Sequence, residues 1–318
     1  MKIGVGIYGS NGHQIQWLLK NNPRAELAAV AAFDAAALPD DYSNKQNIRH
    51  YGTLDEMIHD PNVEIISLCS PVRANQANDA VKCLKNGKHV YAEKPCALSE
   101  SDLDRIIRTA SETGKIFHEM AGTAFEQPYL SMRKLVQSGV LGTVVQVLAQ
   151  KSYPYHDNRP QDEKIDGGLF CQVGVHAARF IEHVACVRIK DIYAIETDLS
   201  NPVENGGLKM AASCMMTLEN GGVASFIANY LNPPAFGSWG NEHLRIFGSH
   251  GFIESVDGGV HTRLVLNGKD MGEIDVSERS ADYFEMFLDE LNGGVMPFSL
   301  EDELHPVRMV IRAKEALL

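Results

Sequence analysis

The segment 168–185 carries four polar side chains at helical spacing: Gln172, His176, Arg179 and His183. At 100° per residue they share one side of a helix, and apolar residues line another side. The imidazole of His176 could exchange a proton near neutral pH. A polar stripe on an amphipathic helix is most often its solvated side, so this pattern alone does not indicate a catalytic site.

A glycine-rich turn near residue 10 is a second candidate site. The sequence matches G-x-G-x-x-G at Gly4, Gly6 and Gly9, but Gly4 and Gly6 alternate with apolar residues and belong inside a strand. Gly9 and Gly12 instead stand between that strand and a helical segment, where backbone amides and the helix dipole can face a pyrophosphate. We therefore expect a dinucleotide to bind at Gly9, Ser10, Asn11, Gly12 and His13.

Two further features bear on the cofactor. Asn11 takes the place of the second glycine of the fingerprint, and asparagine tolerates a left-handed backbone. Asp34 follows the second expected strand, about twenty residues after Gly12, where a carboxylate accepts hydrogen bonds from the adenosine ribose. Because a carboxylate repels a 2′-phosphate, Asp34 favours NAD over NADP.

The elements that must position these residues alternate between strand and helix up to about residue 122. Strand-like runs at 3–7, 26–33, 63–70, 88–93 and 115–120 alternate with helical segments at 13–20, 53–60, 74–87 and 99–114. Thr53 with Glu56 forms a capping box, Ser99 caps a helix, and Gly87 and Gly114 end helices. This α/β pattern predicts a Rossmann-type, doubly wound parallel sheet in residues 1–122, with ligands at the carboxyl ends of its strands.

Residues 123–318 follow a different pattern. Helical segments at 128–138 and 168–185 are followed by strand-like runs at 143–153, 189–198, 208–218, 222–230, 243–247, 251–256 and 261–266. Gly-Gly, Asn-Gly and Asp-Gly pairs separate these runs, as hairpins require, and helical segments at 280–291 and 300–316 follow. We expect an α+β domain built on a large, mostly antiparallel open sheet that binds substrate.

Composition excludes several classes of protein. A chain of 318 residues suffices for two domains, and its net charge of −12 repels nucleic acid. No apolar run approaches the roughly 20 residues that span a bilayer. Six cysteines without a C-x-x-C pair indicate reduced thiols, and no His, Asp or Glu set has metal-ligand spacing. We expect a cytoplasmic protein without a metal or a membrane partner.

The segment "GKHVYAEKP" (87–95), with "EIISLCSP" before it, resembles the Gfo/Idh/MocA family, named for glucose–fructose oxidoreductase and inositol dehydrogenase. "SGVLGTVVQV" (138–147), "GGLFCQVGVHAARF" (167–180) and "NEHLRIFGSHGFIE" (241–254) follow in the order and spacing of that family. The resemblance implies an N-terminal Rossmann domain, nicotinamide-dependent redox chemistry on sugars or polyols, and a C-terminal sheet whose outer face makes a homodimer or homotetramer.

The resemblance also assigns cofactor residues in the first domain. Glu93 and Lys94 match the E-K-P positions, where the lysine lies beside the nicotinamide ribose and the reacting hydroxyl, and where the peptide before the proline is often cis. Ser70 and Pro71 match a T-P pair along the cofactor, and Asn75 replaces the histidine usual in the family.

In the second domain, His176 matches the histidine of the D-x-G-x-H motif, the expected base. Lys94 would then stabilise the substrate oxygen as negative charge develops on it. Gln172 stands where the motif has aspartate, and Arg179 stands where a second acid is common. Because glutamine adds no charge, we expect His176 to be harder to protonate than in relatives with aspartate. We expect His183 on the surface.

The loop 151–164 offers Tyr153, His156 and Arg159 as substrate contacts, although solvated loop residues are the commoner case. Arg159 and Arg179 together suggest an acidic substrate such as a sugar acid. Two alternatives to a sugar or polyol dehydrogenase stay open: an NAD-retaining glycosidase, and a non-catalytic NAD-binding regulator. The presence of both Lys94 and His176 favours an enzyme, because cofactor binding alone needs neither.

Overall fold

The computed structural model describes residues 2–39 and 47–317. Two compact units make up the chain. The first contains residues 1–121, 164–166 and 283–304, and the second contains residues 122–163, 167–282 and 305–318. The prediction of a domain boundary at residue 122 stays a prediction.

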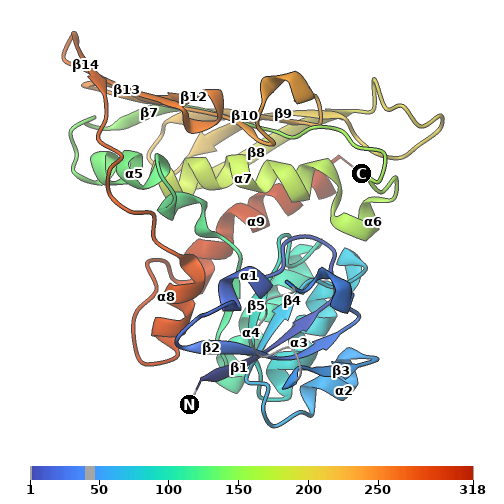
Figure 1. Ribbon diagram of the computed structural model, residues 1–318. Helices are drawn as coiled ribbons and strands as arrows, with labels where there is room; N and C mark the ends of the chain where they lie inside the picture. The colour runs from blue at the N-terminus through green and yellow to red at the C-terminus, as the bar shows by residue number, and fades with distance from the viewer. Residues whose placement is uncertain (1, 40–46, 318) are drawn as a thin grey trace. The chain divides into compact units, whose positions relative to one another are not determined.

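A six-stranded parallel sheet with the strand order β3-β2-β1-β4-β5-β6 forms the first unit (Figure 1). Its elements are β1 (Ile3–Tyr8), α1 (Gln16–Leu19), β2 (Ala25–Ala31), β3 (Arg49–Tyr51), α2 (Leu54–Ile58), β4 (Ile65–Leu68), α3 (Gln76–Lys85), β5 (His89–Ala92), α4 (Glu100–Thr113), β6 (Phe117–Glu119) and α8 (Tyr283–Glu290). This strand order is that of the Rossmann fold. The predicted fold class of the N-terminal part is confirmed.

Glycines inside β1 let neighbouring elements approach it closely. A Cβ at Gly4 would lie 1.7 Å from the backbone oxygen of Asn62, and a Cβ at Gly6 would lie 2.9 Å from Sδ of Met57 in α2. Both glycines therefore serve strand packing, as their alternation with apolar residues predicted. The glycine turn after β1 is the one at Gly9 and Gly12.

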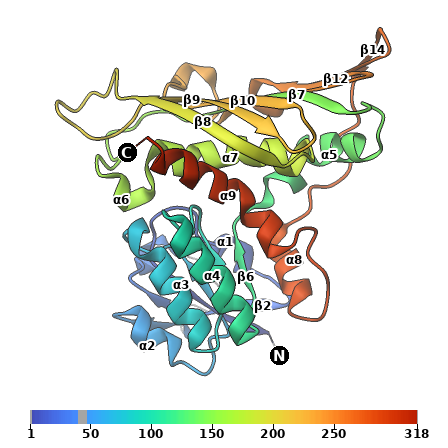
Figure 2. The same ribbon diagram turned by 180° about the vertical axis from the view of Figure 1, so that it is seen from behind.

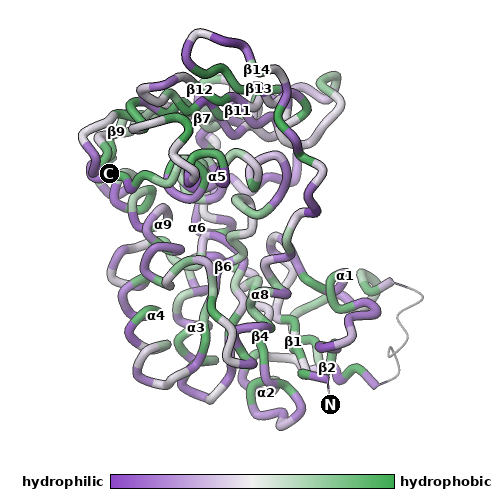
Figure 3. The backbone as a smooth tube through the Cα atoms, turned by 90° about the vertical axis from the view of Figure 1, so that its left-hand side faces the viewer, coloured by the Kyte–Doolittle hydropathy of each residue, from purple (hydrophilic) through white to green (hydrophobic). Residues whose placement is uncertain are grey.

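Helices α2 and α4 of the first unit begin at the predicted caps, and α4 ends at the predicted glycine. Thr53 and Glu56 form the capping box of α2, and Ser99 caps α4 by accepting from the amide of Asp102. Gly114 ends α4 with a left-handed φ of 64°. α3 and α4 lie side by side against the sheet (Figure 2), and hydrophilic and hydrophobic residues alternate along both (Figure 3). This alternation follows from one buried and one solvated side of each helix.

The second unit is built on an eight-stranded sheet with the order β14-β13-β12-β11-β7-β10-β9-β8. The strands are β7 (Val144–Ser152), β8 (Ile189–Thr197), β9 (Ala211–Leu218), β10 (Val223–Asn229), β11 (Asn241–Gly248), β12 (Gly251–Val256), β13 (His261–Leu266) and β14 (Lys269–Glu273). Within the described residues of this sheet, the β7–β10 pair is parallel and the other pairs are antiparallel. The large, mostly antiparallel sheet is therefore confirmed.

Helices α5 (Tyr129–Gln137) and α7 (Val175–Arg179) lie along one face of this sheet (Figure 1). α7 is flanked by two π-helical turns, η5 (Phe170–Gly174) and η6 (Phe180–Val184). The rings of Phe170 and Phe226 pack 5.8 Å apart, which fixes η5 on β10. Two further helices, α6 (Glu163–Asp166) and α9 (Leu300–Glu315), contain residues of both units.

Three local predictions were incomplete or wrong. The strands β3 and β14 were not predicted, and β14 has no buried residue whose alternation could reveal it. The helix expected at 13–20 spans only Gln16–Leu19.

No helix within the described ranges is long and apolar enough to cross a bilayer.

Candidate active site

The turn after β1 is shaped by its two glycines. Gly9 and Gly12 have φ values of +73° and +117°, which side-chain-bearing residues rarely adopt. A Cβ at Gly9 would lie 2.1 Å from the backbone oxygen of Cys69, and a Cβ at Gly12 would lie 2.6 Å from Cγ of Glu93. The turn therefore packs directly on the segments that follow β4 and β5.

Side chains of the turn hold it in place. Asn11 Nδ2 donates to the backbone oxygens of Pro71 (3.3 Å) and Ile165 (2.5 Å). Gln14 Nε2 donates to the backbone oxygen of Ser10 at 3.0 Å and also to that of Gly12. These bonds to Gln14 keep the chain in a turn up to residue 15, so the helix begins later than predicted and is short. The expected contribution of a long helix dipole is correspondingly small.

Sequence reasoning missed the side chains that connect the β1 turn to the β4 and β5 segments. Arg73 is 1% exposed and donates to Gln76 Oε1 and to the backbone oxygen of Asn11. Gln76 is fully buried; its oxygen accepts from the amide of Ser70 (3.1 Å), and its amide donates to the backbone oxygens of Glu93 and Pro95. The sequence signal that could have indicated these contacts is the polar pair Arg73 and Gln76, spaced i and i+3 after a strand.

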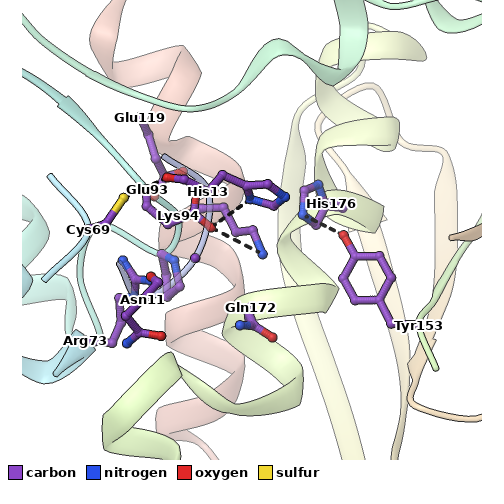
Figure 4. A network of polar contacts seen from close by, with 12 residues as sticks. Asn11, His13, Cys69, Arg73, Glu93, Lys94, Glu119, Tyr153, Gln172 and His176 are labelled. Carbon is purple, nitrogen blue, oxygen red and sulfur yellow. Dashed lines mark hydrogen bonds and ion pairs between the residues drawn. The ribbon is translucent and has the colours of Figure 1, made fainter. Parts of the chain in front are cut away.

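Glu93 and Lys94 lie at the carboxyl end of β5, both buried (Figure 4). Glu93 Oε1 lies 3.2 Å from His13 Nδ1 and 3.8 Å from Lys94 Nζ. Burial alone would raise the pKa of Glu93, but the hydrogen bond from His13 and the charges of Lys94, His13 and Arg73 outweigh it and hold the pKa below its ordinary value. Glu93 is therefore an ionised carboxylate inside the unit. The Lys94–Pro95 peptide is cis, as the resemblance implied.

The other cofactor candidates lie on loops of the same unit. Asp34 is exposed just after β2, and its Oδ1 accepts from the amide of Ala36 (2.9 Å). Ser70 is buried and donates to Asp79 Oδ2 (2.8 Å), whereas Asn75 is exposed at the start of α3. Because β1, β2, β4 and β5 run parallel, the turn, Asp34 and Lys94 all follow carboxyl ends of one sheet. The glycine turn and this edge fit a bound dinucleotide.

In the second unit, Tyr153 and His176 form a pair (Figure 4). The Tyr153 hydroxyl lies 3.4 Å from His176 Nε2, and the two rings meet edge-on with centroids 6.2 Å apart. Trp239 packs 6.0 Å from the rings of both Tyr153 and His156. The helical run places His176 so that its ring is partly exposed. The predicted substrate contacts Tyr153 and His156 and the predicted base His176 are thus linked through rings.

The side-chain oxygen of Gln172 contacts two residues, Tyr230 and Arg159. Its Oε1 accepts from the Tyr230 hydroxyl (3.1 Å) and from Arg159 Nη1 (3.4 Å). Arg159 also donates to the backbone oxygen of Pro154 (3.3 Å), and its guanidinium stacks 3.7 Å from the centre of the Tyr230 ring. The oxygen of Gln172 is therefore directed to a buried cation and a phenol.

Only part of the predicted polar stripe is exposed to solvent. Gln172 and His176 are partly exposed, but Arg179 is 1% and His183 is 2% exposed. The expectation of His183 on the surface was wrong. A π-helical turn contains more residues than an α-helical one, so η5 and η6 rotate the positions that 100° spacing would align.

Two family models match the chain. One, described as the oxidoreductase family with an NAD-binding Rossmann fold, covers residues 2–120, and one for the Gfo/Idh/MocA C-terminal domain covers residues 129–254. The chain belongs to the Gfo/Idh/MocA family of oxidoreductases. The expectation from "GKHVYAEKP" is confirmed, and the N-terminal unit carries the NAD-binding Rossmann domain of this family.

Relatives in the Gfo/Idh/MocA family are distant. The myo-inositol 2-dehydrogenase of Thermotoga maritima is 25% identical over 142 residues, covering 44% of this chain and 41% of that one. The trans-1,2-dihydrobenzene-1,2-diol dehydrogenase of Bos taurus is 28% identical over 188 residues, covering 58% and 56%. The chain thus matches about half the length of these curated relatives. A Thermotoga maritima protein of solved structure is 25% identical with a TM-score of 0.88, covering 98% of this chain and 97% of that one.

A metal centre was not expected from the sequence. Among the residues that the structure describes, no group of three His, Cys, Asp or Glu side chains could hold a metal ion.

Proposed function

We propose that this chain transfers a hydride between NAD(H) and a hydroxyl-bearing carbon of a sugar, polyol or sugar-acid derivative. The observation that carries the proposal is the buried ammonium group of Lys94. It is 3% exposed and lies beside the ionised carboxylate of Glu93, at the carboxyl end of a strand of the Rossmann sheet. Cofactor binding alone does not require a buried ammonium there. Two relatives are named for oxidising a cyclic polyol and a cyclic diol, which is the same class of reaction.

The residues of the first unit have distinct proposed roles toward the cofactor. The backbone amides of Gly9, Ser10, Asn11, Gly12 and His13 hold the pyrophosphate. Asp34 accepts from the adenosine ribose and disfavours a 2′-phosphate. Ser70, Pro71 and Asn75 line the middle of the cofactor, and Glu93 holds Lys94 and His13 in position. When bound, NAD supplies the hydride acceptor in the oxidative direction.

The acid–base step is proposed for His176. In oxidation its imidazole takes the hydroxyl proton, and Lys94 Nζ donates a hydrogen bond to the oxygen that becomes negatively charged. The Tyr153 hydroxyl, 3.4 Å from Nε2, makes a weak hydrogen bond that helps to orient the imidazole. Gln172 belongs to the same site through Arg159 and Tyr230. Tyr153, His156, Arg159 and Arg179 are the proposed substrate contacts.

A spectrophotometric screen tests the proposal. The full chain is mixed with NAD or NADP and with polyols, aldoses and sugar acids, and absorbance at 340 nm is followed. We expect turnover with NAD and a loss of about 10²–10⁴-fold in kcat for His176→Asn, with NADH binding retained. A stable complex that never exchanges cofactor while releasing an aglycone would indicate the glycosidase instead. NADH binding with no turnover across the panel would contradict the enzyme assignment.

We also propose a homo-oligomer formed through the outer face of the second sheet. Tyr193 and Ile195 of β8 are 66% and 70% exposed, and Met215 of β9, paired with Tyr193, is 70% exposed. Such a contiguous apolar face favours burial in an interface. Light scattering should show a dimer or tetramer, and Met215→Glu should lower the mass. A monomeric wild-type protein would contradict this.

A cytoplasmic location is the proposal that best suits the cysteines. All six cysteines are free thiols, and five of them are buried. Burial raises the pKa of Cys171 to about 12, which keeps that thiol protonated and unreactive. Thiols kept reduced are typical of the cytoplasm. Fractionation of cells that produce the protein tests this, and recovery outside the cytoplasm would contradict it.

A further inference from the structure

Arg159 is a buried cation in the second unit without an acidic partner. Its side chain is 6% exposed, and within residues 2–39 and 47–317 no carboxylate makes an ion pair with it. Its partners are two neutral oxygens, those of Gln172 and Pro154, and the face of the Tyr230 ring. Its Nε is buried and has no hydrogen-bond partner in the described ranges.

The buried cations differ in their partners: Arg73 and Lys88 also donate to neutral oxygens, whereas two lysines have an adjacent carboxylate. Lys94 lies beside Glu93, and Lys151 pairs with Glu242. A charge taken out of water without a counter-ion destabilises the fold, and a ring face and two long hydrogen bonds offset only part of that effect. An anion from outside the chain would offset the remaining part of that effect at Arg159.

The neutral side chain of Gln172 leaves the positive charge of Arg159 uncompensated. A carboxylate at this position would pair with Arg159, whose Nη1 already reaches the side-chain oxygen at 3.4 Å. The neutral amide orients the guanidinium without neutralising it. Gln172 lies four residues before His176, and Pro154 follows Tyr153, which contacts His176. Arg159 is thus linked to His176 through the adjacent residues Pro154 and Tyr153.

We propose that the substrate is an anionic sugar or polyol whose carboxylate pairs with Arg159. This inference rests on the proposed function, because it places the carboxylate in the site of His176. A planar guanidinium donates two parallel hydrogen bonds to a carboxylate, and stacking on Tyr230 fixes its plane. Specificity for the acid then comes from Arg159 with Gln172, and the hydride-transfer groups stay the same.

The direct test is calorimetric titration of the full chain saturated with NADH. The probes are two matched pairs, D-glucose with D-glucuronate and D-galactose with D-galacturonate, and glucose 6-phosphate. We expect at least one acid to bind about tenfold or more tightly than its neutral partner, because a hydrogen-bonded charge pair replaces a neutral contact. Equal affinities, no measurable binding of either acid, or preference for the phosphate alone would overturn the proposal.

Variants then test whether Arg159 is responsible. Arg159→Met and Gln172→Asp should each lower the acid-to-neutral affinity ratio by about tenfold, whatever loss they cause in the binding of neutral sugars. Arg159→Lys keeps the charge and should retain part of the preference. The matched control is Arg263→Met, which removes an exposed arginine paired with Asp270 and should leave the ratio unchanged. Equal losses for acids and neutral sugars in Arg159→Met would show a merely structural role and overturn the proposal.

The outcome is separable from that of the proposed function. Turnover at 340 nm with neutral sugars and no preference for acids would overturn only the anionic substrate. Preferential binding of the acid without any NADH formation or consumption would support Arg159 recognition and contradict the hydride-transfer function.

Discussion

Replacing Gly12 with alanine tests how the cofactor turn depends on Glu93. Gly12 has a φ of +117°, outside the left-handed region that alanine tolerates, and its added Cβ would lie 2.6 Å from Cγ and 2.8 Å from Oε1 of Glu93. A buried carboxylate must then move away from His13 and Lys94. Gly114→Ala is the matched control, because Gly114 also has a positive φ (+64°) but no atom of the described chain within 4 Å of the new Cβ.

The two substitutions differ in expected magnitude. Backbone strain alone should cost Gly114→Ala about 1–2 kcal/mol of stability. For Gly12→Ala, strain at an unfavourable φ of about 1–3 kcal/mol is joined by loss of the hydrogen bond between His13 and Glu93, about 1.5–3 kcal/mol for a charged acceptor. We therefore expect a total of roughly 2.5–6 kcal/mol, with the loss of stability concentrated where the dinucleotide binds.

Thermal unfolding with and without NADH measures both effects. Gly114→Ala should lower the midpoint slightly and keep the full stabilisation by NADH. Gly12→Ala should lower the midpoint further and bind NADH at least about tenfold more weakly, which calorimetry can confirm. If Gly12→Ala binds NADH as tightly as the wild type does, then the contact with Glu93 does not shape the cofactor turn and the reasoning is refuted.

Three other predictions follow from side-chain contacts. Gln172→Asp should move the acid limb of the pH–rate profile to higher pH, by less than about one unit because Arg159 shares the new charge; an unchanged limb would contradict the assigned role of Gln172. Tyr153→Phe should lower kcat about tenfold, alter the pH profile and change KM little, since it removes the partner of His176 Nε2 but keeps the ring; equal kcat and pH profile would argue against this contact. Burial lowers the pKa of His118, but Glu303 and Glu290 outweigh it and raise that pKa to about 10. The stabilisation that protonated His118 contributes is therefore complete below the unfolded pKa of about 6.5 and is lost as pH rises through 10. The melting temperature should fall between pH 7 and 10, and it should fall less in His118→Gln.

The Rossmann part was predictable because its signals are local. Thr53, Glu56 and Ser99 satisfy the amides at the start of their own helices, and Gly114 ends one in a conformation that suits glycine. Continuous apolar runs mark strands buried on both faces. The family resemblance added Lys94 and His176, to which composition and spacing alone assign no role.

The unpredicted features depend on contacts between distant segments. β14 is exposed at every residue and exists through backbone pairing with β13, so no side-chain pattern marks it. The π-helical turn η5 before α7 lies where Phe170 and Gly174 meet Phe226 of β10, and no periodicity analysis assumes such turns. The Arg73–Gln76 contacts join three loops that are adjacent only in the folded sheet.

The parallel pairing of β7 with β10 bears on biosynthesis of the chain. β7 lies between β10 and β11, whose first residues are Val223 and Asn241, so both neighbours of this strand are translated long after it. Until then the backbone amides and carbonyls of β7 are available to any other extended chain. Products truncated before residue 223 should therefore aggregate or engage chaperones, whereas a chain that extends through β11 covers both edges of the strand.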